Sequence, residues 1–526
     1  MAFNLNLAIK PLCQTFIQSI DPNPAQEYQA DKGDNIVAID NYLYVINGYV
    51  NTQGRRVQDI FKIDANTHEI VNQIEMQGPQ TDLAISDRGG LCVTPDEHIL
   101  ITGEWSDYDA LRMRTFIAKL NKDLEIVWIN YYPDLSDGHL YGDALAQTAT
   151  GDILLYLIEG EADLSGNPWL SISGKIRIVK TDAFGEVIFN KIIPDTFQFT
   201  LGYGHLAPTE DGNFLLTSQV RGYYYHPQYG TYLYNTILHK IDSNANPIWS
   251  RMVNYAKFLM QNPVMTTLEG GGGAVMWAKD TFVPDPTIAF SFNILKRYNS
   301  TGSLSWTHEW NDVAIRSVGR LITAQNGDIL GCGYYSGSSL DSKGRGWLFR
   351  MTPAGEVVWE RHYTDSLQRP WSPLIEFLDL CELDDGRIAA TGIVFDLNSD
   401  GIWNPNVALI VVDDQGCLDP GCSGYDQFIT STFEPIFRLP DLPLLAISPN
   451  PTPGPFRVQL PEALEPGKNW ELRCYDLQGK LWQQLPWPKG DSALNIDGSS
   501  WAPGLYLPVL FEHNRPVATG KIIIQP

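Results

Sequence analysis

The chain has 526 residues, of which 37 are Lys or Arg and 61 are Asp or Glu, so its formal net charge is −24. Nucleic acids and anionic membrane surfaces are bound through basic faces, and this charge argues against both as main partners. With 44% hydrophobic and 19% charged residues, the chain can bury a large core. Its 45 glycines, 34 prolines and 11% aromatic residues favour a turn-rich, all-β protein.

The N-terminal segment and the distribution of apolar runs lead to expectations about export, membrane insertion and the fold. Residues 1–20 carry a single charge, at Lys10, and have no clear apolar core, so they make a poor signal peptide as written. No run approaches 18 apolar residues, and the sequence therefore predicts no transmembrane helix. Residues 14–20 form a spare strand, which we expect to pair with residues 407–412 and to close the ring of repeats described next.

An Asp-Gly or Asn-Gly turn recurs along the chain between apolar runs. These residues tolerate positive φ, so each copy predicts a two-residue turn between the first and second strands, A and B, of a repeated unit. The copies, some of them divergent, lie at residues 94–100, 150–154, 210–215, 325–330 and 384–388.

A second motif, Lys-x-Asp-x-x-Gly-x-φ-x-Trp with φ an apolar residue, predicts the turn between strands C and D and the start of strand D. Its copies end on a large residue at positions 71, 128, 189, 249, 306 and 359, which are 53–61 residues apart. A seventh copy stops at Cys417. A four-stranded unit repeated at this period predicts a seven-bladed β-propeller over residues 1–430, with the recurring Trp packed between blades.

The repeat is lost after a Pro-rich linker at residues 431–444, and short strands with Asn, Asp and Gly turns predict a small β-sandwich over residues 445–526. This segment contains Ser-Pro-Asn-Pro, Tyr-Asp-Leu-Gln-Gly-Lys, Gly-Leu-Tyr and a terminal Lys-Ile-Ile-Ile, in that order. The four blocks resemble the type A sorting domain of the type IX secretion system of Bacteroidetes. The resemblance implies export across the outer membrane by the type IX machinery, followed by removal of the domain or attachment to the cell surface.

The cysteines predict one local disulfide. Cys417 and Cys422 bracket a Leu-Asp-Pro-Gly turn that can close in an oxidising compartment. Zinc is not expected there, because no second Cys or His pair follows at ligand spacing. Most of the other cysteines lie in apolar strand patterns and are expected to be buried and unpaired, namely Cys92, Cys332, Cys381 and Cys474.

Ligand binding is expected on the face that carries the B–C loops, which are long and varied, whereas the A–B and C–D turns are minimal. Four polar residues just before the inner strands are expected to ring the mouth of the central channel. These residues are Asp143, His205, Arg320 and Asp379. Such a ring suits a small polar ligand or acid-base chemistry. The alternative is a solvated channel entrance.

Two loops offer further candidate sites. Tyr224, Tyr225 and Tyr229 present flat apolar faces with a hydroxyl edge, which suit a sugar ring or a protein partner, unless their loop packs over the neighbouring blade. Residues 396–404 place oxygen side chains around a glycine and resemble the calcium loops of some propellers; the alternative is a metal-free Asx turn. The candidate calcium ligands are Asp396, Asn398, Asp400 and Asn404.

Together these patterns favour a secreted or cell-surface propeller that binds an extracellular glycan or protein, as a monomer. The sequence lacks Gly-x-Ser-x-Gly, His-Glu-x-x-His and Walker motifs. The alternative function is that of an extracellular polysaccharide lyase or hydrolase with its site at the channel mouth.

Overall fold

A computed structural model describes residues 16–525 with several gaps. The gaps are residues 21–31, 51–55, 77, 79–82, 87–89, 108–111, 161–173, 194–199, 202–203, 227–230, 257–262, 283–288, 311–314, 337–343, 366–373, 398–402, 419–420, 423–425, 430–442, 462–463, 465–469, 477–480 and 513–514. The chain divides into two compact units, Met1–Asp21 with Gln26–Ile436, and Phe437–Pro526 with Pro22–Ala25. Every regular element in the described ranges is a β-strand. Nowhere in those ranges is there a helix whose length and apolar character would let it cross a membrane.

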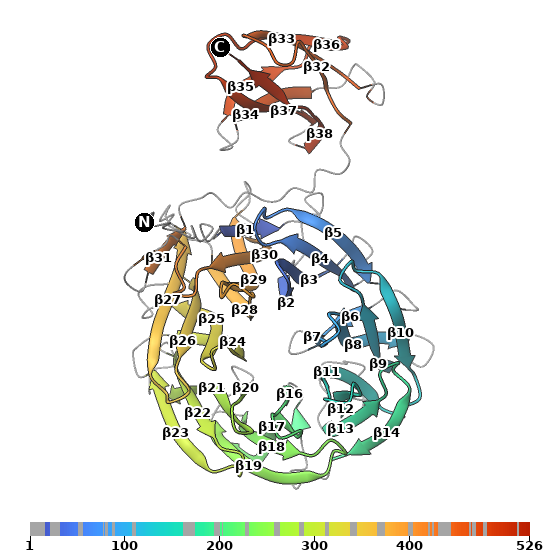
Figure 1. Cartoon of the computed structure of the whole chain (residues 1–526), viewed down its shortest axis with the longest axis vertical. Helices are drawn as coiled ribbons and strands as arrows, with labels where there is room; N and C mark the ends of the chain where they lie inside the picture. Colours follow the sequence, from blue (N-terminus) through green and yellow to red (C-terminus); the bar gives the residue numbers. More distant parts are fainter. Residues whose placement is uncertain are drawn as a thin grey trace, which may run out of the picture. The chain divides into compact units, whose positions relative to one another are not determined.

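The first unit is a β-propeller, in which antiparallel sheets are arranged in a ring (Figure 1). The first sheet contains β2 (Lys32–Ile39), β3 (Tyr42–Val50), β4 (Arg56–Asp64) and β5 (Ile70–Met76). The second contains β6 (Leu83–Ile85), β7 (Leu91–Val93), β8 (Ile99–Asp107), β9 (Arg112–Leu120) and β10 (Ile126–Tyr132). In the second sheet, β6 and β7 both pair with β8, so that an interrupted strand occupies the innermost position.

A nine-stranded sheet follows, in which two four-stranded sets are joined through the two-residue strand β15 (Thr200–Leu201). The first set contains β11 (His139–Gln147), β12 (Ile153–Gly160), β13 (Gly174–Thr181) and β14 (Val187–Ile192). The second contains β16 (Leu206–Pro208), β17 (Phe214–His226), β18 (Thr231–Ile241) and β19 (Pro247–Ala256). The next sheet contains β20 (Val264–Leu268), β21 (Gly272–Phe282), β22 (Ala289–Tyr298) and β23 (Leu304–Trp310).

The last two sheets of the ring each take a strand from elsewhere in the chain. One contains β24 (Ile315–Thr323), β25 (Ile329–Ser336), β26 (Gly344–Met351), β27 (Val357–Asp365) and, parallel to β27, β31 (Asp426–Ile429). The other contains β28 (Leu374–Glu382), β29 (Ile388–Leu397), β30 (Trp403–Val412) and the N-terminal strand β1 (Phe16–Ile20). Strand β1 is antiparallel to β30 with Phe16 opposite Val411, so the last sheet is completed by the start of the chain.

The innermost strands contact one another in a closed order: β2, β7, β11, β16, β20, β24, β28 and again β2. This order explains why the first and last sheets are neighbours in Figure 1, although they come from opposite ends of the propeller's amino-acid sequence. Because the ring is closed, every sheet has a neighbour on each of its two faces. Apolar residues on both faces of a blade are therefore buried.

The C–D turns owe their sequence to a side-chain cap. In the turn after β13, Oδ1 of Asp182 accepts hydrogen bonds from the backbone N–H groups of Phe184 and Glu186, both at 2.9 Å. Gly185 ends the turn with φ +84. The same capping by an Asn or Asp oxygen occurs at Asn121, Asp242, Asn299 and Asp413. The acidic position of the repeated motif is thus a local backbone cap.

The A–B turns at the five predicted copies of the motif differ from the prediction of two-residue turns. In the β11–β12 connection, the N–H of Thr148 donates to the carbonyl of Asp152 and the N–H of Gly151 donates to the carbonyl of Thr148. Three residues therefore lie between the bonded pair, and the glycine, with φ +90, is the third of them. This is a turn followed by a left-handed glycine, in which only one residue needs positive φ.

The recurring Trp packs between sheets, as predicted. Trp249 on β19 donates from Nε1 to the carbonyl of Ser300 at 2.8 Å, in the C–D turn of the next sheet. A Cβ atom at Gly302 of that turn would lie 2.8 Å from the Trp249 ring, so the turn needs glycine for its φ of +76 and also for close approach. Trp306 and Trp359 repeat the arrangement, donating to the carbonyls of Pro353 and Asp414 in the following turns.

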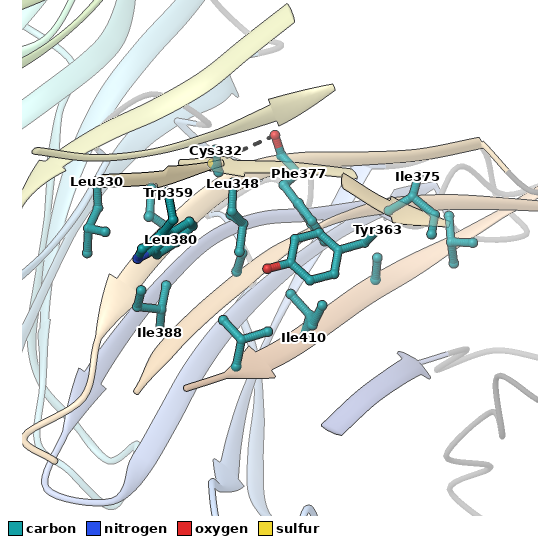
Figure 2. Packing of buried hydrophobic residues seen from close by; sticks show 14 of the residues in the cluster. Leu330, Cys332, Leu348, Trp359, Tyr363, Ile375, Phe377, Leu380, Ile388 and Ile410 are labelled. Carbon is teal, nitrogen blue, oxygen red and sulfur yellow. Dashed lines mark hydrogen bonds between the residues drawn. The ribbon is translucent and has the colours of Figure 1, made fainter. Parts of the chain in front are cut away.

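Apolar clusters fill the spaces between successive sheets. In one of them the rings of Trp359, Tyr363 and Phe377 pack among aliphatic side chains from the last two sheets of the ring (Figure 2). The thiol of Cys332 in this cluster lies 3.8 Å from the carbonyl oxygen of Phe377, the contact drawn in Figure 2. Cys92, Cys381 and Cys474 are likewise free and buried or half-buried.

Cys417 and Cys422 form the predicted disulfide. Cys417 follows the C–D turn of the last sheet, where Tyr363 donates its hydroxyl hydrogen to the carbonyl of Gly416 at 2.7 Å. Strand β31 begins shortly afterwards and lies against β27. Because β1 occupies the outer position beside β30, the chain leaves the last sheet at this turn.

The second unit contains two sheets around one apolar cluster that includes Trp470, Trp487 and Trp501. The smaller sheet contains β32 (Ala446–Ser448), β33 (Pro455–Gln459) and β36 (Ala493–Asp497). The larger contains β34 (Trp470–Asp476), β35 (Leu481–Pro486), β37 (Gly504–Glu512), β38 (Arg515–Thr519) and β39 (Ile522–Ile524).

Candidate functional site

Irregularities in the inner strands position the polar residues that face the centre of the ring. The register of β24 against β25 shifts between Val318 and Arg320, and that of β28 against β29 shifts between Phe377 and Asp379. A β-bulge turns the strand locally and re-aims the residues beside it. Arg320 and Asp379 therefore lie within inner strands, directly after a bulge, and not ahead of the strands as predicted from the sequence.

Arg320 connects two of the predicted residues. Its Nη1 donates a hydrogen bond to Nδ1 of His205 at 2.8 Å, although the two residues are 115 positions apart. Its Nε lies 3.5 Å from Oδ1 of Asp379. A guanidinium group has no acceptor, so Nδ1 of His205 must carry the lone pair in this contact. Three of the four predicted polar residues thus meet, from β28, β24 and the residue that precedes β16.

Asp379 is the buried member of this group, with 9% of its side chain exposed, compared with 23% for Arg320. Its Oδ2 accepts the backbone N–H of Ile36 at 3.1 Å and its Oδ1 accepts that of Leu380 at 2.9 Å. Burial raises the pKa of Asp379 above its ordinary value, and the charge of Arg320 and the two amide hydrogen bonds oppose this rise.

His205 is fixed by its own backbone. Its N–H donates to Oγ1 of the buried Thr217 at 3.0 Å, and its carbonyl accepts the N–H of Thr217 at the same distance. The residue as a whole is 4% exposed. His205 is therefore held where it meets Arg320, and the sequence offered no sign of this, because Thr217 is an ordinary strand residue of β17.

The remaining predicted residues are placed only in part. Asp143 occupies the bulge of β11, between Gly142 and Ala144, and its side chain lies outside the described part of the structure. Tyr224 and Tyr225 lie on β17 with undescribed side chains, and Tyr229 lies outside the described residues.

The predicted calcium loop is also described only at its ends. Asp396 on β29 and Asn404 on β30 are directly opposite in the ladder, with undescribed side chains. Asn398 and Asp400 lie outside the described residues. Within the described residues there is no group of three or more His, Cys, Asp or Glu side chains that could hold a metal ion. Calcium at this loop stays a prediction.

One residue at the centre was missed. Asp34 lies in β2 at a register shift between Gly33 and Asn35 and is only 2% exposed. Its dipeptide, Gly33-Asp34, stands at the same place in its strand as Gly142-Asp143 in β11. That shared Gly-Asp pair was the signal in the sequence that could have identified it.

Comparisons with known proteins extend this description. No curated protein matches the chain. Among solved structures, an ulvan lyase of the polysaccharide lyase family PL25 is 8% identical to this chain in sequence. The similarity covers 77% of this chain and 96% of the lyase at a TM-score of 0.45. A GH93 α-L-arabinofuranosidase of Fusarium graminearum is 10% identical, with 76% and 98% covered at a TM-score of 0.40.

A third similar structure is the β-propeller domain of the Trilobed protease from Pyrococcus furiosus. It is 10% identical, with 70% of this chain and 92% of that one covered at a TM-score of 0.37. At these identities the likeness concerns the fold alone, and no activity is assigned from it.

The second unit is matched at the level of sequence family. Residues 446–525 match the family described as a secretion system C-terminal sorting domain. The matched segment spans all the strands of the second unit, from β32 to β39. The chain therefore carries a sorting domain that follows the propeller in the sequence, and the protein is secreted or displayed at the outer cell surface.

Proposed function

We propose that this protein is an extracellular glycan-binding module, built as a seven-bladed β-propeller and exported through a C-terminal β-sandwich by a type IX secretion system of the kind found in Bacteroidetes. The closed order of inner strands supports the seven blades, counting the nine-stranded sheet as two. The match of residues 446–525 supports the export route.

The observation that carries the binding role is the meeting of His205, Arg320 and Asp379. These residues come from three different sheets of the ring, so only the closed fold brings them together. Each is held by further hydrogen bonds or charge, which gives a rigid polar group on or directly beside strands, the arrangement that suits recognition.

The same contacts favour binding over catalysis. Both oxygens of Asp379 accept backbone N–H groups, and Nδ1 of His205 accepts from Arg320. The Asp379 oxygens are thus occupied by backbone amides, and Nδ1 of His205 is occupied by the arginine. A general acid or base acts through an atom that can reach the reacting proton, so these occupied atoms suit a supporting role better than a catalytic one.

The test is a glycan and polysaccharide array probed with the full chain, with release of reducing ends followed on every hit. Arg320→Ala and His205→Ala are expected to weaken binding at least tenfold, about 1.4 kcal/mol. Lys122→Ala, which removes a charge at the exposed C–D turn after β9, is the matched control and should bind like the unmodified protein.

The outcomes separate the candidate functions. Binding without cleavage, lost in the two variants, supports the proposal. Cleavage that disappears in the variants while affinity persists would make the protein a polysaccharide lyase or hydrolase. An array without any hit would contradict a glycan ligand and direct the search to a protein partner at the cell surface.

A further inference from the structure

The guanidinium group of Arg320 is held on two of its sides and not on the third. Asp379 lies 3.5 Å from Nε, and His205 accepts from Nη1 at 2.8 Å. Among the described residues no acceptor contacts Nη2. With 23% of its side chain exposed, Arg320 is also the most accessible of the three residues.

Asp379 does not cover the free edge of the guanidinium. A carboxylate that neutralises arginine fully binds two of its nitrogens through both oxygens. Here Oδ2 is taken by the backbone N–H of Ile36, Oδ1 also accepts from Leu380, and the contact with Nε is not a hydrogen bond. The carboxylate therefore fixes the position of the arginine, and hydrogen-bonding capacity remains on the Nη side.

The free edge determines which chemistry fits. Guanidinium N–H groups are donors only, in a planar fork that matches the two oxygens of a carboxylate or the oxygens of a sulfate. A neutral sugar hydroxyl accepts from one such donor but brings no opposite charge and no second acceptor oxygen, so it forms neither the ion pair nor the bidentate contact. The partly exposed, preordered edge of Arg320 is thus better suited to an oxyanion than to a hydroxyl group.

We propose that Arg320 binds a carboxylate or sulfate ester group of an acidic glycan, with His205 and Asp379 as the residues that orient it. This inference rests on the proposed glycan-binding function and specifies its ligand class. Asp379 and His205 are less than 10% exposed, whereas 23% of the Arg320 side chain is exposed, so the ligand meets the arginine rather than the two residues that orient it. The formal net charge of −24 repels polyanions in general, so the affinity must come from this local contact.

The experiment uses the full chain and a panel of acidic polysaccharides, each paired with its carboxyl-reduced or desulfated form. Affinities are measured by biolayer interferometry at fixed ionic strength. The acidic form of the recognised glycan is expected to bind at least tenfold more tightly than its neutral form. Arg320→Ala should lower the affinity of the acidic form to that of the neutral form, whereas Lys122→Ala should preserve the difference.

A second measurement needs no variant, and it covers the case in which Arg320→Ala fails to fold. Inorganic sulfate should displace the acidic glycan from the unmodified protein, whereas sodium chloride at the same ionic strength should displace it less. Equal displacement by the two salts would show general screening and would overturn the assignment.

The remaining outcomes distinguish this inference from the function on which it rests. Equal affinity for acidic and neutral forms, weakened in Arg320→Ala, overturns the acidic ligand class and leaves glycan binding intact. A preference for acidic forms that survives in a folded Arg320→Ala protein overturns the role of Arg320. Binding of acidic peptides and of no glycan, or no binding at all, overturns both.

Discussion

The turns of the sheets and the bulges of their inner strands differ in how far their residues repeat from sheet to sheet. At the end with the A–B and C–D turns, the same contacts recur from sheet to sheet: an Asn or Asp cap, a left-handed glycine and a Trp from the preceding sheet. At the bulges of the inner strands the side chains vary more: β2 and β11 share an Asp, Asp34 and Asp143, whereas β24 places Arg320 and β28 places Asp379 directly after the bulge. Residues that repeat build the ring, whereas residues that do not repeat are available for recognition.

A further set of contacts links strand C of a sheet to the A–B turn of the same sheet. Lys119 on β9 lies 2.8 Å from Asp96 in the A–B turn of the same sheet, and Lys180 stands at the same distance from Asp152. Lys240 and Arg350 repeat the contact with Asp211 and Asp328. The basic residue of the repeated motif therefore connects strand C to the neighbouring hairpin.

The largest test of this contrast removes a repeated Trp. Trp359 is 5% exposed and donates to the carbonyl of Asp414. Trp359→Ala should lower the free energy of unfolding by about 4 kcal/mol, because a large buried side chain and its hydrogen bond are lost. Urea denaturation followed by fluorescence measures the loss. Val358→Ala, at a position 47% exposed on the same strand, is the control and should change stability by less than about 0.5 kcal/mol.

The second test separates close approach from backbone conformation. Gly302→Ala should cost about 3 kcal/mol, since the added Cβ meets the Trp249 ring and the residue keeps a positive φ. Gly327→Ala is the matched control, because Gly327 has φ +86 with nothing within 4 Å of the added atom. It should cost about 1 kcal/mol. Equal losses in the two variants would show that the Trp contact contributes nothing.

The third test concerns a polar residue that does not repeat. His239 lies between Ser218 and Ser250, and burial lowers its pKa to about 4. An unfolded histidine takes up a proton below about pH 6.5, so His239 should cost about 2 kcal/mol of stability between pH 7.5 and pH 5. His239→Gln should remove this loss in urea titrations at the two pH values. An unchanged difference between the pH values would contradict a neutral, buried His239.

The smallest effect is expected at the ion pairs between strand C and the A–B turn. Lys119→Ala should lower stability by about 0.5 kcal/mol, because Asp96 is largely exposed and water screens the pair. Asp96 has a lowered pKa of about 2, chiefly through its hydrogen bond with Lys119, so the contribution exists above about pH 4 and is lost as the pH falls towards 2. Thermal unfolding at low and high salt measures this contribution. A loss of stability above about 1.5 kcal/mol would contradict a weak, solvent-screened ion pair.

Features that depend on neighbours in the sequence were predictable. The Asp-x-x-Gly turn is closed by hydrogen bonds between residues two to four apart, so its residue types identify it without the fold. The disulfide between Cys417 and Cys422 is equally local. The A–B turns were predicted too short, because an Asp-Gly pair fits a two-residue turn and a three-residue turn with a terminal glycine alike.

Other features follow from closure of the ring. Asp143, His205, Arg320 and Asp379 were recognised as polar residues near inner strands, but the sequence could not show that Arg320 reaches His205 or that Ile36 caps Asp379. These contacts join residues 115 and 343 positions apart. Local propensity determines turns and strands through bonds between near neighbours, whereas only the closed ring decides which side chains from separate sheets meet, and with which atoms.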